Sequence, residues 1–179
     1  RSFRDIHMTD RDVIHRVMAD TPEASALVHL PTKAMGTPLI QYDETDWEFV
    51  LRIASPLETS VIPDVSAPLP RLHVGMPKGS AQSAPQGLRH RVSFDRSYYT
   101  YPREKFAKTQ FLYRDIDCYE RYSIGDEISF MGQAFPVHRI TYKLECGLLL
   151  GTYRLADRAQ LFQNRVYNPN LRGLSLHGT

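Results

Sequence analysis

The sequence predicts an α+β fold, in which a small helix-plus-hairpin unit precedes an antiparallel, β-barrel-like domain. Two segments with helical periodicity and capping signals lie before residue 60 of the 179 residues. From Leu88 onward, short strand-like segments alternate with turn residues instead. Hydrophobic residues make up 42% of the chain, and the ten Tyr and eight Phe favour β structure. This composition is sufficient for a core in each part.

The first helix is predicted to follow Thr9, which can cap it together with Asp12. Four apolar residues then repeat on one helical face: Val13, Ile14, Val17 and Met18. Pro22 ends this helix, because the residue before a proline is disfavoured in the helical region. A strand is predicted at residues 26–30.

A second strand at residues 39–42 leads into the second helix, for which Thr45 and Glu48 form a capping box. The apolar residues predicted to share its buried face are Trp47, Val50, Leu51 and Ala54. Pro56 removes a helical hydrogen bond, so the helix is expected to end or kink near Ala54 or Ser55.

A hairpin of two strands, residues 59–63 and 71–76, completes a unit spanning residues 1–76. Residues 77–87 contain no large apolar side chain and are rich in Gly, Ser, Ala and Gln. Such a segment is predicted to be a flexible loop that marks an insertion or a domain boundary.

Residues 88–160 are predicted to form the antiparallel β-barrel-like domain. The expected strands are residues 89–94, 111–119, 127–130, 134–142 and 148–156, with a short helical turn at 102–108. The last three strands, joined by tight turns, form a meander typical of small barrels. Residues 161–179 are predicted to be a linker and the first strand of a following domain. We therefore expect the chain, which begins at Arg1, to be a fragment of a longer protein.

No pattern in the sequence predicts a metal or cofactor site. The seven histidines have neither an HExxH motif nor a pair at positions i and i+4: His7, His15, His29, His73, His90, His138 and His177. Acidic residues do gather at positions 43–48, where two interpretations are open. They could supply a carboxylate pair for acid–base chemistry, or they could cap the second helix and interact with its dipole. We favour capping, because it accounts for every member.

The other chemical signals are equally weak. Asp115 and Asp117 alternate along one strand and are expected to be solvated. Cys118 and Cys146 could form a disulfide, but two reduced thiols are the favoured state in a cytosolic product. No Gly-x-Ser-x-Gly motif occurs. We expect no catalytic, cofactor-binding or metal-binding residues.

Nucleic-acid and membrane binding are also not predicted. The net charge is +2, from 22 basic and 20 acidic residues, which gives no basic face for a nucleic acid. The aromatic run Tyr98, Tyr99 and Tyr101 could stack on bases, but sheet packing or a protein interface is the favoured interpretation. Apolar runs are too short to span a membrane.

A motif at residues 41–54 suggests a family. It reads Gln-Tyr, an acidic pair, then Asp-Trp-x-Phe-x-x-Arg-Ile-Ala. This motif resembles the hub proteins of contractile phage tails and type VI secretion systems, the late-control D, VgrG and Pvc8 group. Further segments resemble these proteins in the same chain order: residues 1–6, 61–64, 72–77, 122–130, 137–140, 153–155, 167–169 and 174–179. Pro56 and the loop at 77–87 depart from the family pattern.

The resemblance implies a structural protein that is not an enzyme. It implies a homotrimer in the full-length protein, acting as a symmetry adaptor between the tail tube, or a tube-initiator protein, and the spike and baseplate proteins. The protein would be made in the bacterial cytoplasm and assembled into a virion tail or a phage-tail-like particle. The alternative is a peptidoglycan hydrolase, which needs a carboxylate pair in a cleft, or a glycan-binding module, which needs an exposed aromatic platform.

Overall fold

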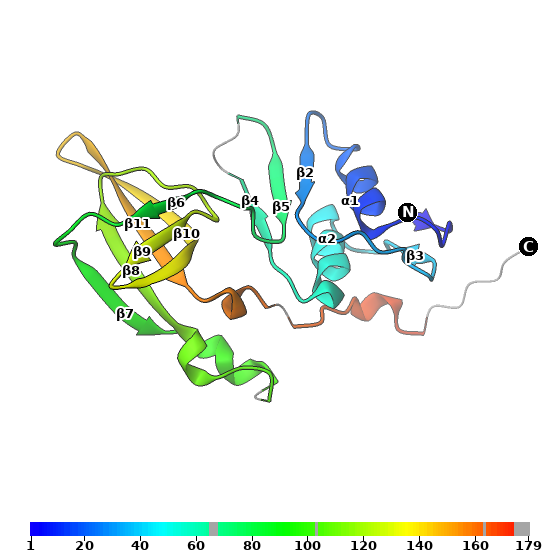
Figure 1. The fold of residues 1–179 in the computed structure, drawn as a ribbon. Coiled ribbons are helices and arrows are strands. Elements are labelled where there is room, and N and C mark those ends of the chain that lie inside the picture. Colours follow the sequence, from blue (N-terminus) through cyan, green and yellow to red (C-terminus); the bar gives the residue numbers. More distant parts are fainter. Residues whose placement is uncertain (65–67, 103, 163, 174–179) are drawn as a thin grey trace, which may run out of the picture. The chain divides into compact units, whose positions relative to one another are not determined.

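The computed structural model describes residues 1–64, 68–102, 104–162 and 164–173, which fall into two compact units. Unit 1 contains Arg1–Gly75 together with residues 164–173, and unit 2 contains Met76–Phe162 (Figure 1). None of the described helices has the length and hydropathy needed to cross a membrane.

Both helices of unit 1 begin at the predicted capping boxes. Helix α1 spans Asp10–Met18, and the Thr9 and Asp12 side chains each accept a hydrogen bond from the other residue's backbone N–H. Helix α2 spans Asp46–Ala54 and starts at Thr45 in the same way. It ends at Ala54 and continues as a 3₁₀ turn, Ser55–Leu57, as the proline at position 56 predicts.

Two small sheets surround these helices. Strand β1, Ser2–Phe3, pairs antiparallel with β3, Leu39–Ile40. Strand β5, Arg71–Val74, lies between β4, Val61–Pro63, and β2, Ser25–Val28. The β4–β5 pair is antiparallel and confirms the predicted hairpin, whereas the β2–β5 pair is parallel.

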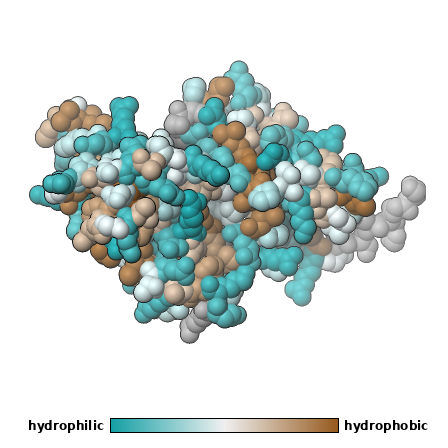
Figure 2. Space-filling view, in the orientation of Figure 1, coloured by the Kyte–Doolittle hydropathy of each residue, from teal (hydrophilic) through white to brown (hydrophobic). Residues whose placement is uncertain are grey.

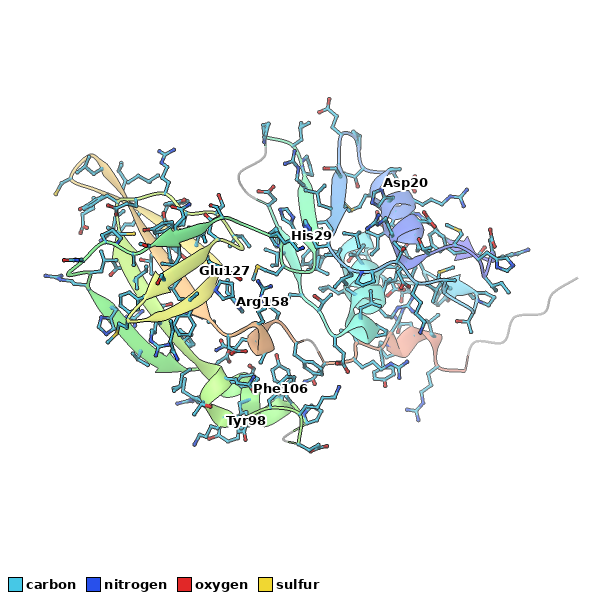
Figure 3. All side chains as sticks on the ribbon, in the orientation of Figure 1. Asp20, His29, Tyr98, Phe106, Glu127 and Arg158 are labelled. Carbon is cyan, nitrogen blue, oxygen red and sulfur yellow. The ribbon has the colours of Figure 1, made fainter. Side chains whose placement is uncertain are left out.

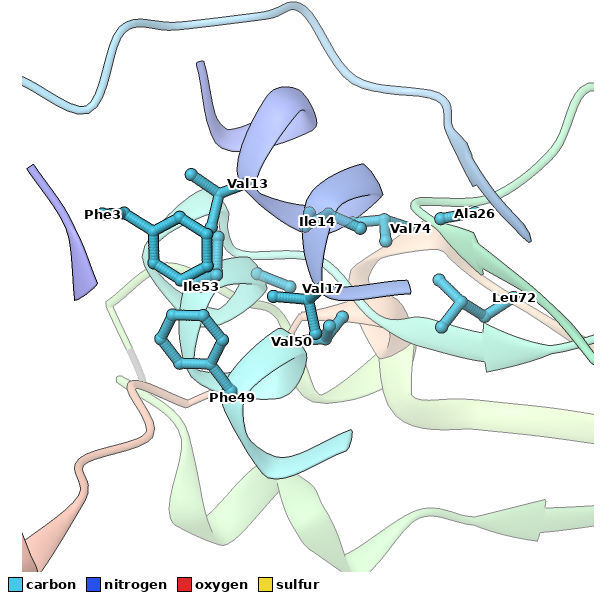
Figure 4. Close-up of a cluster of buried hydrophobic side chains, with 11 residues drawn as sticks. Phe3, Val13, Ile14, Val17, Ala26, Phe49, Val50, Ile53, Leu72 and Val74 are labelled. Atoms are coloured by element: carbon cyan, nitrogen blue, oxygen red, sulfur yellow. The ribbon is translucent and has the colours of Figure 1, made fainter. Parts of the chain in front are cut away.

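The core of unit 1 corrects the predicted face of α2. Phe49, Val50, Ile53 and Ala54 are buried against the apolar stripe of α1 (Figure 4). Trp47 is 43% exposed, so placing it on the buried face was wrong. Val50 and Ala54 lie on the buried face as predicted, whereas Phe49 and Ile53 take the places expected for Trp47 and Leu51. Periodicity alone did not fix the limits of this face.

Unit 2 is built on one six-stranded sheet, in the order β6-β9-β10-β11-β8-β7. Its strands have these bounds: β6 Ala81–Ser83, β7 His90–Phe94, β8 Leu112–Cys118, β9 Glu127–Phe130, β10 Gln133–Glu145 and β11 Leu148–Ala156. All neighbours are antiparallel except β6 and β9. The ring of His90 in β7 meets that of Phe130 in β9, although these strands are not neighbours, so the sheet curls. These features confirm the predicted α+β fold class and the three-stranded meander.

Short 3₁₀ helices join the strands of unit 2 at Arg96–Thr100 and Lys108–Phe111, and another follows β11 at Arg158–Leu161. The helical turn expected at 102–108 is reduced to a hydrogen-bonded turn between Pro102 and Lys105.

The segment 77–87 differs from the expected loop without regular structure. It contains β6, which pairs with β9, and the backbone N–H of Gly79 donates to the carbonyl of Gly125. A Cβ on Gly79 would lie 2.4 Å from the Asp126 backbone nitrogen, so the two segments are packed in close contact. Small residues here permit this approach, so their size reflects close packing and not a lack of anchoring.

Residues 164–173, expected to be a linker, pack on unit 1. The Val166 N–H donates to Ser55 Oγ at 2.9 Å, and Asn168 Nδ2 donates to the Tyr42 carbonyl at 2.7 Å. A 3₁₀ turn follows at Pro169–Leu171. The strand expected at 174–179 lies outside the described residues.

Candidate interaction surface

The acidic residues around the start of α2 all make structural bonds: Asp43, Glu44, Asp46 and Glu48. Glu44 and Arg52 form an ion pair at 2.6 Å, with both side chains largely buried. Hydrogen bonds from the Thr45 backbone and side chain lower the pKa of Glu48. Glu48 caps the helix as predicted, but Asp43, Glu44 and Asp46 are bound by Asn170, Arg52 and Gln41, so capping does not account for every member. These contacts leave no pair of carboxylates converging on a substrate.

Asp115 was expected to be solvated, and this was wrong. Its carboxylate is 7% exposed and is bound by Arg154 Nε at 2.9 Å and by Arg91 Nη2 at 3.2 Å. Burial would raise the pKa of Asp115, but the hydrogen bonds from Arg154 and Arg91 outweigh it, so the pKa lies below its ordinary value. Asp117 remains exposed and accepts a hydrogen bond from Thr152.

Neither cysteine has the environment of a nucleophile. Both are free thiols, with Cys118 buried and Cys146 exposed. Burial, with the Glu120 charge adding to it, raises the pKa of Cys118 to about 11. The reactive thiolate is therefore scarce at Cys118 at neutral pH.

A cleft in unit 1 of about 1100 Å³ contains one acidic side chain, Asp10, among its described lining residues. Burial raises the pKa of Asp10, although the Lys33 charge opposes this. Glycoside hydrolysis by the common mechanisms requires two carboxylates flanking the bond. One carboxylate among basic neighbours does not supply that pair.

A second cleft, in unit 2, measures about 760 Å³ and has two acidic lining residues, Glu127 and Asp157. Both have partners, and the partner of Glu127, Arg158, lines the same cleft. Glu127 pairs with Arg158 at 2.8 Å (labelled in Figure 3), and Asp157 Oδ1 accepts the Ala159 N–H. Among the described residues, no group of three or more His, Cys, Asp or Glu side chains could hold a metal ion.

The tyrosines at 98–101 take part in packing. Tyr98 and Tyr101 contact the fully buried Phe111, and Tyr101 also meets Phe106 and Phe162. Tyr98 and Phe106 are labelled in Figure 3. The rings are mostly tilted or edge to face, the arrangement that aromatic pairs prefer in cores. Tyr98 and Tyr101 therefore fit the packing interpretation of the aromatic run, whereas Tyr99 is 55% exposed.

The strongest surface feature is the β10–β11 hairpin. Cys146 and Gly147 form its two-residue turn, with φ values of 49° and 79°. Positive φ at both positions is the signature of a type I′ turn, whose twist matches that of the flanking strands. Leu144 therefore pairs with Leu149, and Glu145 pairs with Leu148.

One face of this hairpin is apolar from the core to the turn. Because side chains alternate along a strand, Tyr142 and Leu144 share a face with Leu149 and Tyr153 of the paired strand. Tyr153 is fully buried, whereas Tyr142 is 43%, Leu144 71% and Leu149 41% exposed. Figure 2 shows apolar side chains gathered at the end of the hairpin. We call Tyr142, Leu144 and Leu149 the hairpin stripe.

A contiguous exposed apolar stripe indicates a protein-contact surface. The opposite face near the turn carries the charged residues Lys143 and Glu145, together with their paired leucines, Leu150 and the 59% exposed Leu148. Exposed leucines therefore lie on both faces beside the turn. The stripe differs because it carries no charge between the turn and the buried Tyr153, and this makes it the candidate functional site of unit 2.

Sequence comparisons give no match, either among protein families or among curated proteins. Solved structures do match. The 43 kDa tail protein of prophage MuSo2 from Shewanella oneidensis matches 90% of this chain, with a TM-score of 0.64 and 11% identity. A tail protein from Neisseria meningitidis matches 90% of this chain, with a TM-score of 0.61 and 12% identity.

A third match is the E. coli c3393 protein, a type VI secretion component that is structurally similar to the T4 bacteriophage tail proteins gp27 and gp5. It matches 91% of this chain, with a TM-score of 0.57 and 12% identity. The chain spans 52% of that protein, 67% of the Shewanella protein and 70% of the Neisseria protein. At these identities the likeness shows the fold: the chain has the fold of tail proteins.

Proposed function

We propose that the chain belongs to the structural hub of a contractile phage tail or phage-tail-like particle. In this proposal it is a member of the late-control D, VgrG and Pvc8 group and acts as a trimeric symmetry adaptor. The observation that carries the proposal is the match of about nine-tenths of the chain, across both units, to proteins of tails and of a type VI secretion system.

Unit 2 would supply a barrel of the hub ring, and the hairpin stripe would supply a contact within it. A β-sheet surface that joins subunits needs exposed apolar side chains on a rigid frame. Tyr142, Leu144 and Leu149 meet this need, because backbone pairing holds both strands up to the turn. The proposed occupants of the stripe are the neighbouring protomer or the tail tube protein.

The wider proposal concerns partners and location. The full-length protein would form a homotrimer that meets the tail tube, or a tube-initiator protein, and the spike and baseplate proteins. It would be made in the bacterial cytoplasm and then assembled into the particle. Its role would rest on surfaces and not on catalysis, and we expect no hydrolysis of peptidoglycan by the purified chain.

A paired substitution tests the stripe. Changing Leu144 and Leu149 to Ser removes apolar area from one face of the hairpin, whereas changing Thr141 and Lys143 to Ser alters the other face. The proposal predicts that the first pair of changes weakens assembly of the full-length protein and its binding to the tube protein. The second pair should leave both unchanged. Equal assembly by both folded variants would reject the stripe as a contact.

A further inference from the structure

Two histidines far apart in sequence meet in unit 1. Nε2 of His29 lies 2.8 Å from Nδ1 of His73, and the ring centroids are 5.1 Å apart with planes inclined by 24°. His29 directly follows β2 and is exposed (labelled in Figure 3), whereas His73 lies within β5 and its side chain is 13% exposed. A ring nitrogen of His29 therefore faces a ring nitrogen of His73 at a partly exposed surface.

The carboxylate of Asp64 lies beside His73, and Arg71 approaches the same carboxylate oxygen at 3.5 Å. Asp64 Oδ2 lies 3.4 Å from Nε2 of His73, the nitrogen on the far side of the ring from His29. A carboxylate there favours a proton on Nε2, which leaves Nδ1 of His73 with a lone pair directed at His29. Histidines that bind metals share this arrangement, because a carboxylate on the outer nitrogen orients the ring and raises its basicity.

The backbone around the pair is also rigid. The N–H of His29 donates to the Val74 carbonyl at 2.9 Å, which extends the parallel β2–β5 pairing by one step. A site built on paired strands keeps its geometry better than one built on loops. Both histidines are thus held by the same sheet.

We propose that His29 and His73 form a two-imidazole site for a divalent transition-metal ion of the Zn²⁺ or Ni²⁺ type, with Asp64 orienting His73. The ion takes the place of the hydrogen shared between the two nitrogens. His29 then carries its own proton on Nδ1, so both rings remain neutral and no proton leaves the pair. Water completes the coordination, since the described residues offer no third ligand to the group.

The required movement falls on the exposed ring of His29. Bonds of about 2.0–2.1 Å to Zn²⁺ in tetrahedral geometry would separate the two nitrogens by roughly 0.5 Å more than they are now. With His73 in place against Asp64, Nε2 of His29 must also move sideways by roughly 2 Å and its ring must turn, so that both lone pairs meet at the ion. Imidazole favours Zn²⁺, Ni²⁺ and Cu²⁺ over Mg²⁺, which prefers oxygen ligands.

Titration calorimetry with ZnCl₂ and NiCl₂, with MgCl₂ as the hard-cation control, tests the site on the whole chain. We expect one ion per chain for zinc and nickel and no binding of magnesium. His29→Ala should weaken binding at least tenfold without unfolding, because His29 is exposed. Asp64→Asn should weaken it by about 10- to 100-fold while both ligands remain, the usual effect of removing such an orienting group.

His15→Ala is the matched control, because it removes an exposed histidine from α1 of the same unit. This variant should bind like the parent chain. The proposal is overturned if zinc does not bind at millimolar concentration, or if His29→Ala and His15→Ala bind equally well. Full affinity in Asp64→Asn would overturn the orienting role of that carboxylate.

Discussion

Asp126 Oδ1 accepts the backbone N–H of Ser80 at 2.8 Å across 46 positions of sequence. The Ser80 hydroxyl binds the same oxygen at 3.1 Å, and the Ser123 N–H binds Oδ2 at 2.7 Å. With Asp126 5% exposed, this carboxylate fastens the segment before β6 to the turn before β9. Residues 77–87 contain no large apolar side chain, and hydrogen bonds to the buried Asp126 carboxylate hold this segment in place instead.

Asp126→Ala should therefore lower the free energy of unfolding by about 3 kcal/mol, because several hydrogen bonds to one charged carboxylate are lost together. Urea unfolding measures this change. Asp117→Ala removes an exposed aspartate from the same unit and should cost under about 1 kcal/mol. Equal costs for the two variants would show that Asp126 does not fasten the segment.

The buried face of α2 can be tested with two aromatic residues. Phe49→Ala should cost about 3–5 kcal/mol, because it leaves a cavity in the core of unit 1. Trp47→Ala should cost about 1 kcal/mol or less, because Trp47 is 43% exposed. Thermal or urea unfolding of the two variants separates these outcomes, and the reverse order would support the face that periodicity predicted.

Acid should weaken unit 2 through His138, which is the extra residue in a bulge of β10 between Val137 and Arg139. Burial lowers the pKa of His138 to about 4, although the Asp157 charge opposes the shift. The unfolded chain, with an ordinary pKa near 6.5, then binds a proton that the folded chain does not. Stability is therefore complete above about pH 6.5 and decreases as pH falls toward 4, by up to about 3 kcal/mol.

His138→Gln removes this titration. Unfolding curves at pH 7 and pH 4.5 should show a smaller loss for the variant than for the parent chain, and this difference is the readout because other groups also titrate. An identical loss in both proteins would mean that His138 does not carry the effect.

Local signals in the sequence predicted much of the fold. The capping boxes at Thr9 and Thr45 act between residues three apart, and a two-residue turn fixes the β10–β11 pairing by itself. Helix starts, the helix end near position 55 and the meander could therefore be inferred from short segments. The fold class followed from their order along the chain.

Long-range partners could not be predicted in this way. The burial of Asp115 depends on Arg91 and Arg154, which lie 24 and 39 positions away. Histidines 29 and 73 looked isolated because the parallel pairing of β2 with β5 was not foreseen. The exposure of the hairpin stripe could not be predicted either. Alternation along a strand predicts two faces, but only the assembled sheet shows which apolar residues of one face extend beyond the core.

The mass in solution of the full-length protein and of its Leu144→Ser/Leu149→Ser variant, measured by light scattering, tests the hub function. We expect three copies for the parent protein and a shift toward the monomer for the variant at the same concentration. A parent protein that stays monomeric at every concentration would contradict the symmetry-adaptor function.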